Sequence, residues 1–457
     1  MAENRTAVIV GAGIGGLTTA LFLAKQGYGV TVFEKNSSPG GRCSQLTKEG
    51  HRFDLGATMI LMPEIYRSVF RSLGTELEES VSITPLEDLY KIYFDNGRIL
   101  TFTTDREKMK AELEGIEPGS YLKSEDYVRK GYDIFGLSMR KLIDRNFYNI
   151  FQFAHPGNIP LLFRIKAFTS HYRYACRFFR HPHLLMAYTF QNIYVGQSPF
   201  NSPALFSMVP AAELTEGSFF PSRGGLFAVI EKLTEMAERE GVRFFFSTPV
   251  KRIIINGKKA DGIVLQDDTE VRSDIVVANA DLPYVYRELL PDRKASWRLE
   301  KLKYSCSAIC FHWGLDKVYD QLGHHSVFLS DGFRKGLDRI FIEKSVSDNP
   351  SFYVHAPVRT DSSAAPPGHD TLSVIVAAGH VDRERDQDWE SMKNNAREGV
   401  IRRLKMQGLE DIEEHIKFEI SYTPADWESA CNITRGAVFG SLGHNIFQMG
   451  YFRPHNR

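Results

Sequence analysis

The sequence predicts an α/β protein: a Rossmann-like dinucleotide-binding domain, with a parallel sheet interleaved in the sequence, into which an α+β domain is inserted. Three observations predict it. The apolar run from Ala7 to Val10 is followed by a glycine turn, a helix-forming stretch and the β-branched run from Val30 to Phe33. A charged, periodic region at 105–145 indicates amphipathic helices. Strand-like runs then return between residues 243 and 278, which resumes the first domain.

Length and composition bound the class of protein. A chain of 457 residues predicts two or three domains, or one large domain with insertions. The 56 basic and 56 acidic residues balance, so no global field favours nucleic acid and we predict no nucleic-acid partner. Five cysteines without metal-ligand spacing predict a reducing compartment and no metal site. The opening MAENRTAVIV runs directly into a strand and leaves no room for a signal peptide, so we expect an intracellular protein.

The first turn carries a phosphate-binding pattern. Gly11 makes the tight turn, Gly13 lets the backbone approach a pyrophosphate, and Gly16 lets the helix pack on the strand. The phosphates then lie at the helix N-terminus, where free N–H groups and the helix dipole favour anions. Glu34 ends the second strand, at the spacing expected for a carboxylate that binds ribose hydroxyls. The full motif, which fits G-x-G-x-x-G, is Gly11, Ala12, Gly13, Ile14, Gly15 and Gly16.

The next turn indicates which dinucleotide binds. Gly40, Gly41 and Arg42 bring backbone and positive charge towards the same diphosphate. The segments GAGIGGL, VFEKNSSPGGR and FDLGATMI together resemble the FAD-binding opening of the amine-oxidase and phytoene-desaturase superfamily. The resemblance implies FAD as the cofactor, with the flavin ring near the segment 56–58. The further contacts that it implies are Lys35, Gly56, Ala57 and Thr58.

Four later stretches resemble bacterial and fungal phytoene desaturases. They are YVGQSPFNSPALFSMVPAAELTEGSFFPSRGG, VVANAD, SFYVHAPVRTDSSAAPPGHD and the stretch from Thr423 to Arg457. The resemblance implies FAD-dependent desaturation of a carotenoid precursor such as phytoene, by hydride transfer to the flavin and loss of a proton. It adds Val250 and Asp281 to the expected cofactor contacts.

Members of that family continue past the position of Arg457. They have a further strand and a glycine-rich turn of the type FVGxSTHPGxGxP, whose backbone contacts the flavin. The sequence stops before this motif. We therefore expect part of the cofactor site to be absent, and a truncated, inactive flavin-fold protein is one alternative.

Residues 146–212 are apolar and basic. The stretch contains neither Asp nor Glu, and its aromatic residues are interleaved with cations. Such a segment can lie in a bilayer interface, so we expect peripheral membrane association and entry of a hydrophobic polyene there. Polar residues and prolines between 191 and 203 exclude a transmembrane helix. The alternative is a buried helical layer whose cations pair with the acidic 105–145 region. The cations are Arg164, Lys166, Arg173, Arg177 and Arg180.

Strand and turn signals divide the rest of the chain. A hairpin is predicted at Asn256-Gly257, with a type I′ turn. Strands of a second sheet are predicted at 306–316, 339–356 and 371–378. The predicted parts are a first FAD-binding part (1–105), a helical substrate and membrane region (106–220), a second FAD-binding part (221–305), a substrate-domain sheet (306–420) and a C-terminal return (421–457).

The residues that would handle the proton are not determined by the sequence. Asp144 and Arg145 lie where the apolar segment begins and are the first candidates, although a helix-surface ion pair explains them more simply. His324 and His325 fall in a predicted loop, where a solvated or hydrogen-bonded role is expected. Quinone or oxygen is the expected electron acceptor. The alternatives are a carotenoid isomerase, saturase or oxidase of the same fold, or an amine or porphyrinogen oxidase with a polar pocket.

Overall fold

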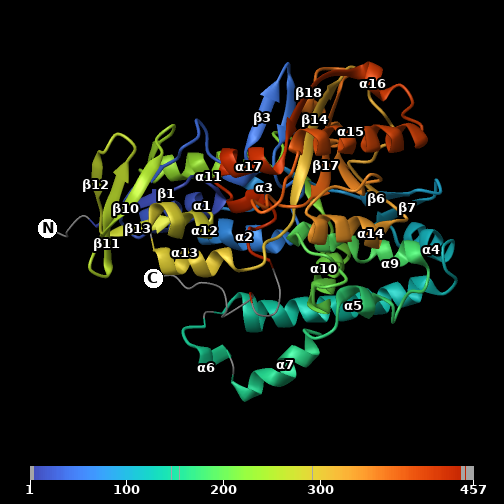
Figure 1. Cartoon of the computed structure of the whole chain (residues 1–457), viewed down its shortest axis with the longest axis horizontal. Coiled ribbons are helices and arrows are strands. Elements are labelled where there is room, and N and C mark those ends of the chain that lie inside the picture. Colours follow the sequence, from blue (N-terminus) through green and yellow to red (C-terminus); the bar gives the residue numbers. More distant parts are fainter. Residues whose placement is uncertain (1–4, 146, 154, 291, 444–447, 449–457) are drawn as a thin grey trace.

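The computed structural model describes residues 5–145, 147–153, 155–290, 292–443 and 448. Figure 1 shows the strands β1 (Thr6–Val10) and β13 (Ile275–Ala278) of one sheet towards one end of the molecule, and β14 (Ser307–Leu315), β17 (Asp370–Ala378) and β18 (Ile416–Tyr422) of another sheet towards the other end. Helices surround both ends. Residues 444–447 and 449–457 of the predicted C-terminal return lie outside the described residues.

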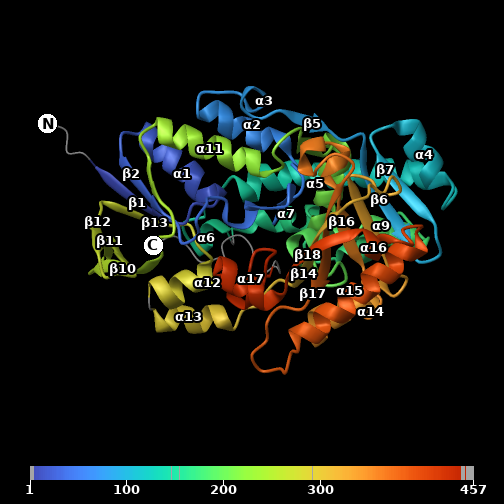
Figure 2. The same cartoon turned by 90° about the horizontal axis from the view of Figure 1, so that it is seen from above.

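The first sheet has four parallel strands in the order β13-β1-β2-β9. Two of its strands come from the beginning of the chain and two from beyond residue 240, which confirms the predicted interleaved parallel sheet. Figure 2 shows the helices α1 and α11 side by side on this sheet. Leu17 and Leu21 of α1 share a core with Ile230 and Leu233 of α11. The elements are β1 (Thr6–Val10), α1 (Ile14–Lys25), β2 (Gly29–Phe33), α11 (Phe227–Arg239), β9 (Arg243–Phe245) and β13 (Ile275–Ala278).

A three-stranded antiparallel sheet extends this end of the molecule. Its strands are β10 (Val250–Asn256), β11 (Lys259–Leu265) and β12 (Glu270–Arg272). The predicted hairpin is confirmed, but the type I′ turn is wrong. Asn256 pairs with Lys259, so Gly257 and Lys258 are the central residues. Gly257 has φ +63° and Lys258 is not among the residues with positive φ, a pattern typical of a type II′ turn with glycine first.

The second sheet has seven strands in the order β18-β14-β17-β16-β15-β6-β7. They are β6 (Asp88–Phe94), β7 (Ile99–Thr103), β14 (Ser307–Leu315), β15 (His325–Leu329), β16 (Phe352–His355), β17 (Asp370–Ala378) and β18 (Ile416–Tyr422). The strands β6 and β7 fall before the predicted boundary at residue 105, yet β6 pairs with β15 in this sheet. The predicted boundary at residue 105 therefore lies after strands that belong to the second sheet. The sequence could not show this, because a pairing between segments so far apart leaves no local pattern.

The predicted strand at 339–356 is only partly a strand. Its first residues continue the helix α14 (Phe333–Asp338) as a single π turn, Arg339–Glu343, and only β16 is extended. Ile340 is buried whereas Ile342 is 61% exposed, so the apolar run follows a helical face. A short apolar run does not distinguish a strand from a helix by periodicity alone.

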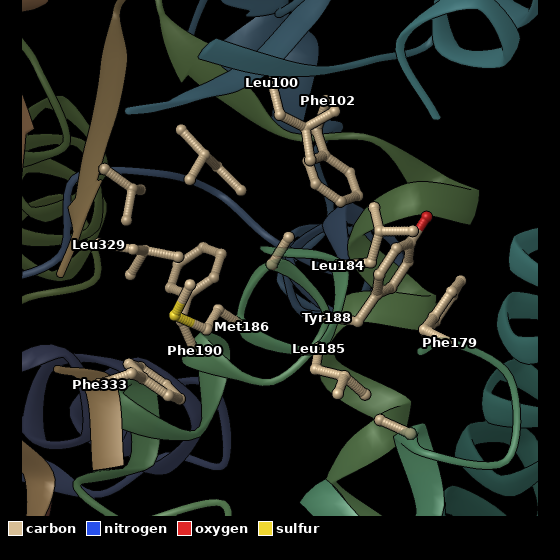
Figure 3. Packing of buried hydrophobic residues seen from close by; sticks show 14 of the residues in the cluster. Leu100, Phe102, Phe179, Leu184, Leu185, Met186, Tyr188, Phe190, Leu329 and Phe333 are labelled. Atoms are coloured by element: carbon tan, nitrogen blue, oxygen red, sulfur yellow. The ribbon is translucent and has the colours of Figure 1, made fainter. Parts of the chain in front are cut away.

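The helices that follow residue 105 confirm the amphipathic helices expected at 105–145. The helices of this region are α4 (Arg106–Glu114), α5 (Ser120–Ser138), α6 (Ile150–Phe153), α7 (Ile159–Arg164), α8 (His171–Ala175), α9 (Pro182–Ala187) and α10 (Met208–Glu216). Gly131 lets α5 approach α10, since a Cβ there would lie 2.6 Å from the Ala211 Cβ. Figure 3 shows Leu184 and Tyr188 packed against Phe102 of β7, so this part of the region forms a core with the second sheet.

The remaining elements connect these parts. They are β3 (Gln45–Lys48), β4 (His51–Asp54), α2 (Pro63–Ser72), α3 (Leu77–Ser80), β5 (Ile83–Pro85), β8 (Phe219–Pro221), α12 (Leu282–Tyr284), α13 (Arg293–Glu300), α15 (Trp389–Met406), α16 (Ile412–His415) and α17 (Pro424–Cys431).

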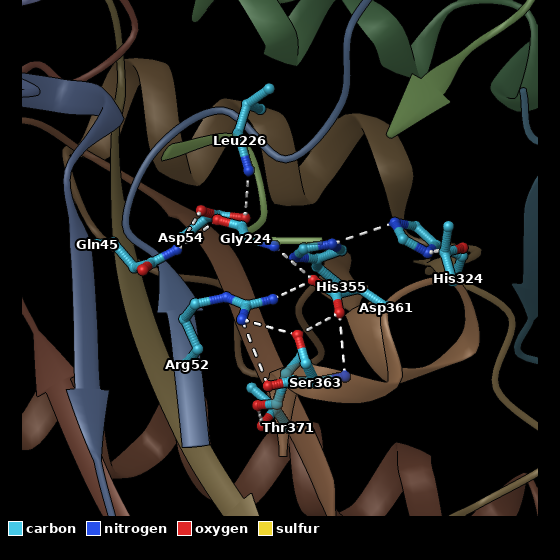
Figure 4. A network of polar contacts seen from close by, with 12 residues as sticks. Gln45, Arg52, Asp54, Gly224, Leu226, His324, His355, Asp361, Ser363 and Thr371 are labelled. Atoms are coloured by element: carbon cyan, nitrogen blue, oxygen red, sulfur yellow. Dashed lines mark hydrogen bonds and ion pairs between the residues drawn. The ribbon is translucent and has the colours of Figure 1, made fainter. Parts of the chain in front are cut away.

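A buried polar network holds the two ends of the molecule together (Figure 4). Asp361, which is 2% exposed, forms an ion pair with Arg52 of β4 and accepts a hydrogen bond from the Gly224 N–H at 2.9 Å. Asp54 accepts from the Leu226 N–H at 3.1 Å, and burial raises the pKa of its carboxyl group to about 6. These contacts tie the loop before β17 to the segment that leads into α11.

We expect Asp361→Ala to lower the free energy of unfolding by about 3–5 kcal/mol, because it leaves the largely buried Arg52 guanidinium without its partner. Urea unfolding measures the change. Asp126→Ala, which removes exposed ion pairs with Arg129 and Lys130, is the control and should cost less than about 1 kcal/mol. Equal costs for the two variants would contradict the structural role of Asp361.

Candidate functional site

A cavity of about 1020 Å³ lies between the two sheets. Ligand pockets usually span roughly 300–1,000 Å³, so this one has room for a large ligand or for two. One end is formed by the carboxyl ends of β1 and β2, where ligands of α/β sheets usually bind. The other end is formed by the second sheet and by α14.

The first glycine turn forms the polar end of the cavity. Gly11 has φ +100°, and a Cβ there would lie 2.5 Å from the Asn279 carbonyl oxygen. A Cβ at Gly16 would lie 2.1 Å from the Gly11 carbonyl oxygen, which agrees with the close helix–strand packing predicted for this glycine. Gly13 is the N-cap of α1 and makes no side-chain cap. The first N–H groups of α1 therefore donate to no side chain of the N-cap residue.

Glu34 connects the end of β2 to this turn. Its carboxylate is 6% exposed, and its Oε2 accepts a hydrogen bond from the Ala12 N–H at 2.8 Å. Its Oε1 accepts from the Asn36 N–H at 2.9 Å. Each carboxylate oxygen keeps a second lone pair, so a ligand hydroxyl can still donate to Glu34.

The second glycine turn lies directly against the first. The Gly40 N–H donates to the Ala12 carbonyl at 2.9 Å, and a Cβ at Gly41 would lie 3.4 Å from the Gly13 Cα. Gly40 and Gly41 have φ +115° and +55°, which favours glycine. A Cβ at Gly56 would overlap the Arg42 carbonyl oxygen at 1.6 Å. Backbone therefore meets backbone where the segments 11–16, 40–42 and 56–58 converge.

Most of the predicted cofactor residues line this one cavity. Lys35 donates from Nζ to the Ser429 carbonyl at 2.9 Å, and burial lowers the pKa of its ammonium group. Asp281 accepts from the Thr434 N–H at 3.0 Å. Ala12 and Gly16 are buried and do not line the cavity. The residues that line the cavity are Gly11, Gly13, Ile14, Gly15, Glu34, Lys35, Gly40, Gly41, Arg42, Gly56, Ala57, Thr58, Val250 and Asp281.

Asn279 is a site residue that the sequence reasoning missed. It follows β13, and its side-chain amide donates to the Gly11 carbonyl at 3.3 Å. A Cβ at Gly15 would lie 2.8 Å from its Oδ1. The VVANAD segment that contains Asn279 resembles phytoene desaturases, but the resemblance does not single out Asn279. Only the parallel pairing of β1 with β13 places its amide over the glycine turn.

One face of the second sheet forms the apolar end of the cavity. Side chains alternate between the two faces of a strand, and residues from one face of four neighbouring strands line the cavity. These residues are Ala308 and Cys310 of β14, Val327 and Leu329 of β15, Tyr353 of β16, and Ile375 and Ala377 of β17. The sequence could not identify this set, because it depends on the register of four strands.

Tyr353 carries the hydroxyl group of this apolar face. Its Oη lies 2.7 Å from the Thr58 Oγ1, which joins it to the segment at the polar end. It also lies 2.6 Å from His325 Nδ1. Burial raises the pKa of the phenol and lowers that of the imidazole, so both groups are neutral near pH 7.

Two sequence assignments need correction or refinement. Asp144 and Arg145 are exposed and lie outside the cavity lining, so this placement does not support a role in proton transfer. The Arg145 guanidinium lies 5.5 Å from the centre of the Phe147 ring. Of the solvated or hydrogen-bonded roles expected for the two loop histidines, the hydrogen-bonded one is confirmed: His324 meets Thr360 and His325 meets Tyr353, and both are buried. The loop assignment is wrong for His325, which opens β15.

The apolar, basic segment divides into buried and exposed parts. Phe178 and Phe179 belong to the core with the second sheet, as the alternative interpretation expects. The acidic side chains of Asp126 and Glu117 pair with cations of their own region, Arg129, Lys130 and Lys123. Figure 1 shows α6 and α7 below α5, away from both sheets. The exposed apolar side chains here are Ile143 (55%), Tyr148 (79%), Phe151 (82%), Ile159 (54%), Phe163 (63%) and Phe168 (63%).

None of the described helices is long and apolar enough to cross a membrane.

Comparison with known proteins places the whole chain in a group. The family model described as flavin containing amine oxidoreductase matches residues 14–457. The chain is 39% identical to a zeta-carotene-forming phytoene desaturase from Myxococcus xanthus, over 100% of the chain and 87% of that protein. It is 37% identical to a phytoene desaturase from Neurospora crassa, over 100% of the chain and 80% of that protein.

Solved structures share the fold at lower identity. A redesigned putrescine oxidase matches with a TM-score of 0.60 at 16% identity, covering 93% of this chain and 86% of that chain. A fatty acid isomerase from P. acnes matches with a TM-score of 0.59 at 16% identity, covering 92% and 86%.

Glu213 gives the site a pH dependence that can be measured. It is 1% exposed, and neither carboxylate oxygen has a hydrogen-bond partner among the described residues. Burial raises its pKa from about 4.5 to about 8, so the folded chain holds a proton that the unfolded chain releases. Its charge, when present, raises the pKa values of Tyr90, Tyr194 and Tyr353.

We expect the stability that Glu213 contributes to be complete below about pH 4.5 and to be lost as the pH rises to about 8. The loss is on the order of a few kcal/mol. Glu213→Gln keeps the shape but does not titrate, so its free energy of unfolding should fall less over this range in urea titrations. The exposed Glu231→Gln is the control and should follow the wild-type curve. A Glu213→Gln curve parallel to wild type would contradict the assignment.

Proposed function

Because the chain belongs to the flavin containing amine oxidoreductases, and within them to the carotenoid desaturases, we propose that it desaturates a polyene such as phytoene in the cavity between its two sheets. The chain is an FAD-dependent oxidoreductase that acts on carbon–carbon bonds. One observation carries the proposal: a single cavity joins a polar glycine end to an apolar sheet face.

The residues at the polar end fit the dinucleotide part of FAD. The glycines of the segments 11–16 and 40–42 let these backbone segments converge at the end of the sheet, and the N-terminus of α1 favours the diphosphate. Glu34 is placed to accept hydrogen bonds from ribose hydroxyls. Val250 lines the same end beside Pro249. In this proposal the segment 56–58 lies beside the flavin ring, where the two ends of the cavity meet.

The residues at the apolar end fit a long hydrocarbon. Leu329, Phe333 and Leu337 line this end and share the core that packs under the helical region. Bound FAD supplies the acceptor for a hydride taken from a saturated carbon–carbon bond. The chain's own side chains align the polyene and keep water away from the reacting carbons.

The product distinguishes desaturation from its alternatives. We expect the purified chain, loaded with FAD and given phytoene in detergent or lipid, to form a product whose absorption is shifted to longer wavelength, because each new double bond extends the conjugated system. An isomerase would leave the chromophore nearly unchanged, and a saturase would shorten it. Gly13→Val should abolish FAD retention and product formation, because its side chain fills the space beside Asn279.

The matched control is Gly136→Ala in α5, where the new Cβ meets only the flexible end of Arg140 at 3.5 Å. It should retain FAD and activity. Wild-type protein that cannot be loaded with FAD would contradict the proposal and support the inactive flavin-fold alternative. FAD retention by Gly13→Val would contradict the assignment of the first turn.

We further propose that the exposed aromatic segment lies against a membrane surface. The exposed side chains of Phe151, Phe163 and Phe168 lie on or beside α6 and α7, and the exposed cation Arg164 follows Phe163 in the sequence. Burying an aromatic ring in the interface is favourable, and each nearby cation adds about 1 kcal/mol on anionic lipid. A lipid surface also supplies a polyene that is insoluble in water. We propose quinone or oxygen, both soluble in membranes, as the final electron acceptor.

We expect wild-type protein to sediment with vesicles of phosphatidylcholine and phosphatidylglycerol. Replacing Phe151, Phe163 and Phe168 together by serine should weaken this binding at least tenfold, because each buried ring contributes roughly 1.5–3 kcal/mol. The control replaces three exposed apolar residues elsewhere, Ile255, Ile342 and Met406, by serine. Equal sedimentation of the two triple variants would contradict docking through α6 and α7.

A further inference from the structure

The apolar face of the second sheet ends at a row of polar side chains. In the cavity, one row across the sheet consists of Val327, Tyr353, Ile375 and Cys310, which are partners in register. The next row on the same face consists of His325, His355, Ser373 and His312. All four side chains of this second row are buried. A strip of imidazole groups therefore borders the hydrocarbon end of the cavity.

Tyr353 connects the cavity to this row. Its Oη accepts or donates at 2.7 Å to Thr58 and at 2.6 Å to His325 Nδ1. His325 Nε2 has no hydrogen-bond partner among the described residues. The simplest arrangement places the proton of His325 on Nε2, with Tyr353 donating to Nδ1 and accepting from the Thr58 hydroxyl.

The surroundings of His325 are dry. The rings of His324 and His355 lie beside it at 4.4 and 5.5 Å, and Phe220 covers both of those rings at 4.5 and 5.2 Å. Figure 4 shows His355 and His324 in contact, with their Nε2 atoms 3.2 Å apart. His324 Nδ1 meets the Thr360 hydroxyl at 2.7 Å. The charged or titratable groups that act on Tyr353 are Glu213 and Asp54, and those that act on His325 are His324 and His355.

We propose that Tyr353 is the proton acceptor of the desaturation and that His325 stores the proton. This inference rests on the proposed function. The C–H bond next to the carbon that has lost a hydride to FAD breaks, and its electron pair becomes the new π bond. The proton binds Tyr353 Oη while the original hydroxyl proton of Tyr353 moves to His325 Nδ1. Tyr353 is then again a neutral phenol and His325 an imidazolium, so atoms and charge balance.

The hydrogen bond between Tyr353 and His325 explains how a neutral phenol can accept the proton. A neutral phenol is a weak base, but a phenol that gives up its own proton as it receives another needs no phenolate. After the product leaves, the same path in reverse returns the proton to water that enters the cavity. Thr58 holds Oη at the junction of the polar and apolar ends, close to the place proposed for the flavin ring.

Tyr353→Phe tests the proposal, because it removes Oη and keeps the ring. We expect unchanged FAD binding and a loss of about 10²–10⁴-fold in the rate at which the desaturated product forms. The matched control is Tyr93→Phe, which removes a buried hydroxyl from the same sheet, bound to the Gln321 carbonyl at 2.5 Å and outside the cavity lining. It should keep the wild-type rate. Equal rates for the two variants would overturn the proposal.

One further measurement does not depend on turnover. In nitrogen NMR of the chain without substrate, His325 should have an unprotonated Nδ1 that accepts a hydrogen bond, and Tyr353→Phe should shift that resonance. His325→Gln keeps a hydrogen-bond acceptor but cannot store the proton, so it should also lose about 10²–10⁴-fold in rate. It decides the question if Tyr353→Phe does not fold.

A metal would require a different role for these groups. The ligand atoms of His324, His325 and His355 lie within 4.8 Å of one another, close enough to share an ion. If the purified protein contains one zinc ion per chain, the ion would occupy the imidazole nitrogens of these histidines. His325 could then not store the proton, and the proposal would be overturned. If wild-type protein desaturates no polyene, the proposed function fails and this inference fails with it. If wild type desaturates and both Tyr353→Phe and His325→Gln keep its rate, this inference alone fails.

Discussion

Backbone segments at the end of the parallel sheet pack directly against one another, because glycines leave no side chains between them. The positions of the two sheets depend on this packing. A Cβ at Gly16 would meet the Gly11 carbonyl at 2.1 Å, and one at Gly56 would meet the Arg42 carbonyl at 1.6 Å. These contacts bring three segments to the same point at the end of the parallel sheet. Since Thr58 follows directly and contacts Tyr353, the position of the second sheet is coupled to the same point.

The sequence predicted what depends on local order. The strand, turn, helix and strand between Thr6 and Phe33 are contiguous, so their patterns and the six residues of the glycine motif were enough to place the polar end of the cavity. The glycine segments could be identified because glycine is required where a backbone must approach closely or take a positive φ. Residues 444–447 and 449–457 lie outside this comparison.

What could not be predicted depends on pairings between distant segments. The strand β6 joins β15 across more than two hundred residues, and no local pattern marks that pairing. The face that carries Val327 and Tyr353 exists only once β15, β16 and β17 are in register. For the same reason the histidines near residue 325 were interpreted as loop residues, whereas strand pairing buries them. Asn279 also acquires its place only through the pairing of β13 with β1.

The apolar end of the cavity imposes a constraint of its own. A hydrocarbon site that excludes water also removes the ordinary acceptor for a proton, and burying an unpaired charge there is costly. Neutral groups that pass a proton along a hydrogen bond accept it without water and move the charge away from the reacting carbons. The structure has such groups only where the apolar face meets the polar row, at Tyr353 and His325, among the described cavity-lining residues and their direct partners on that sheet face. The positive charge then lies on His325, which is buried next to Tyr353 and does not line the cavity.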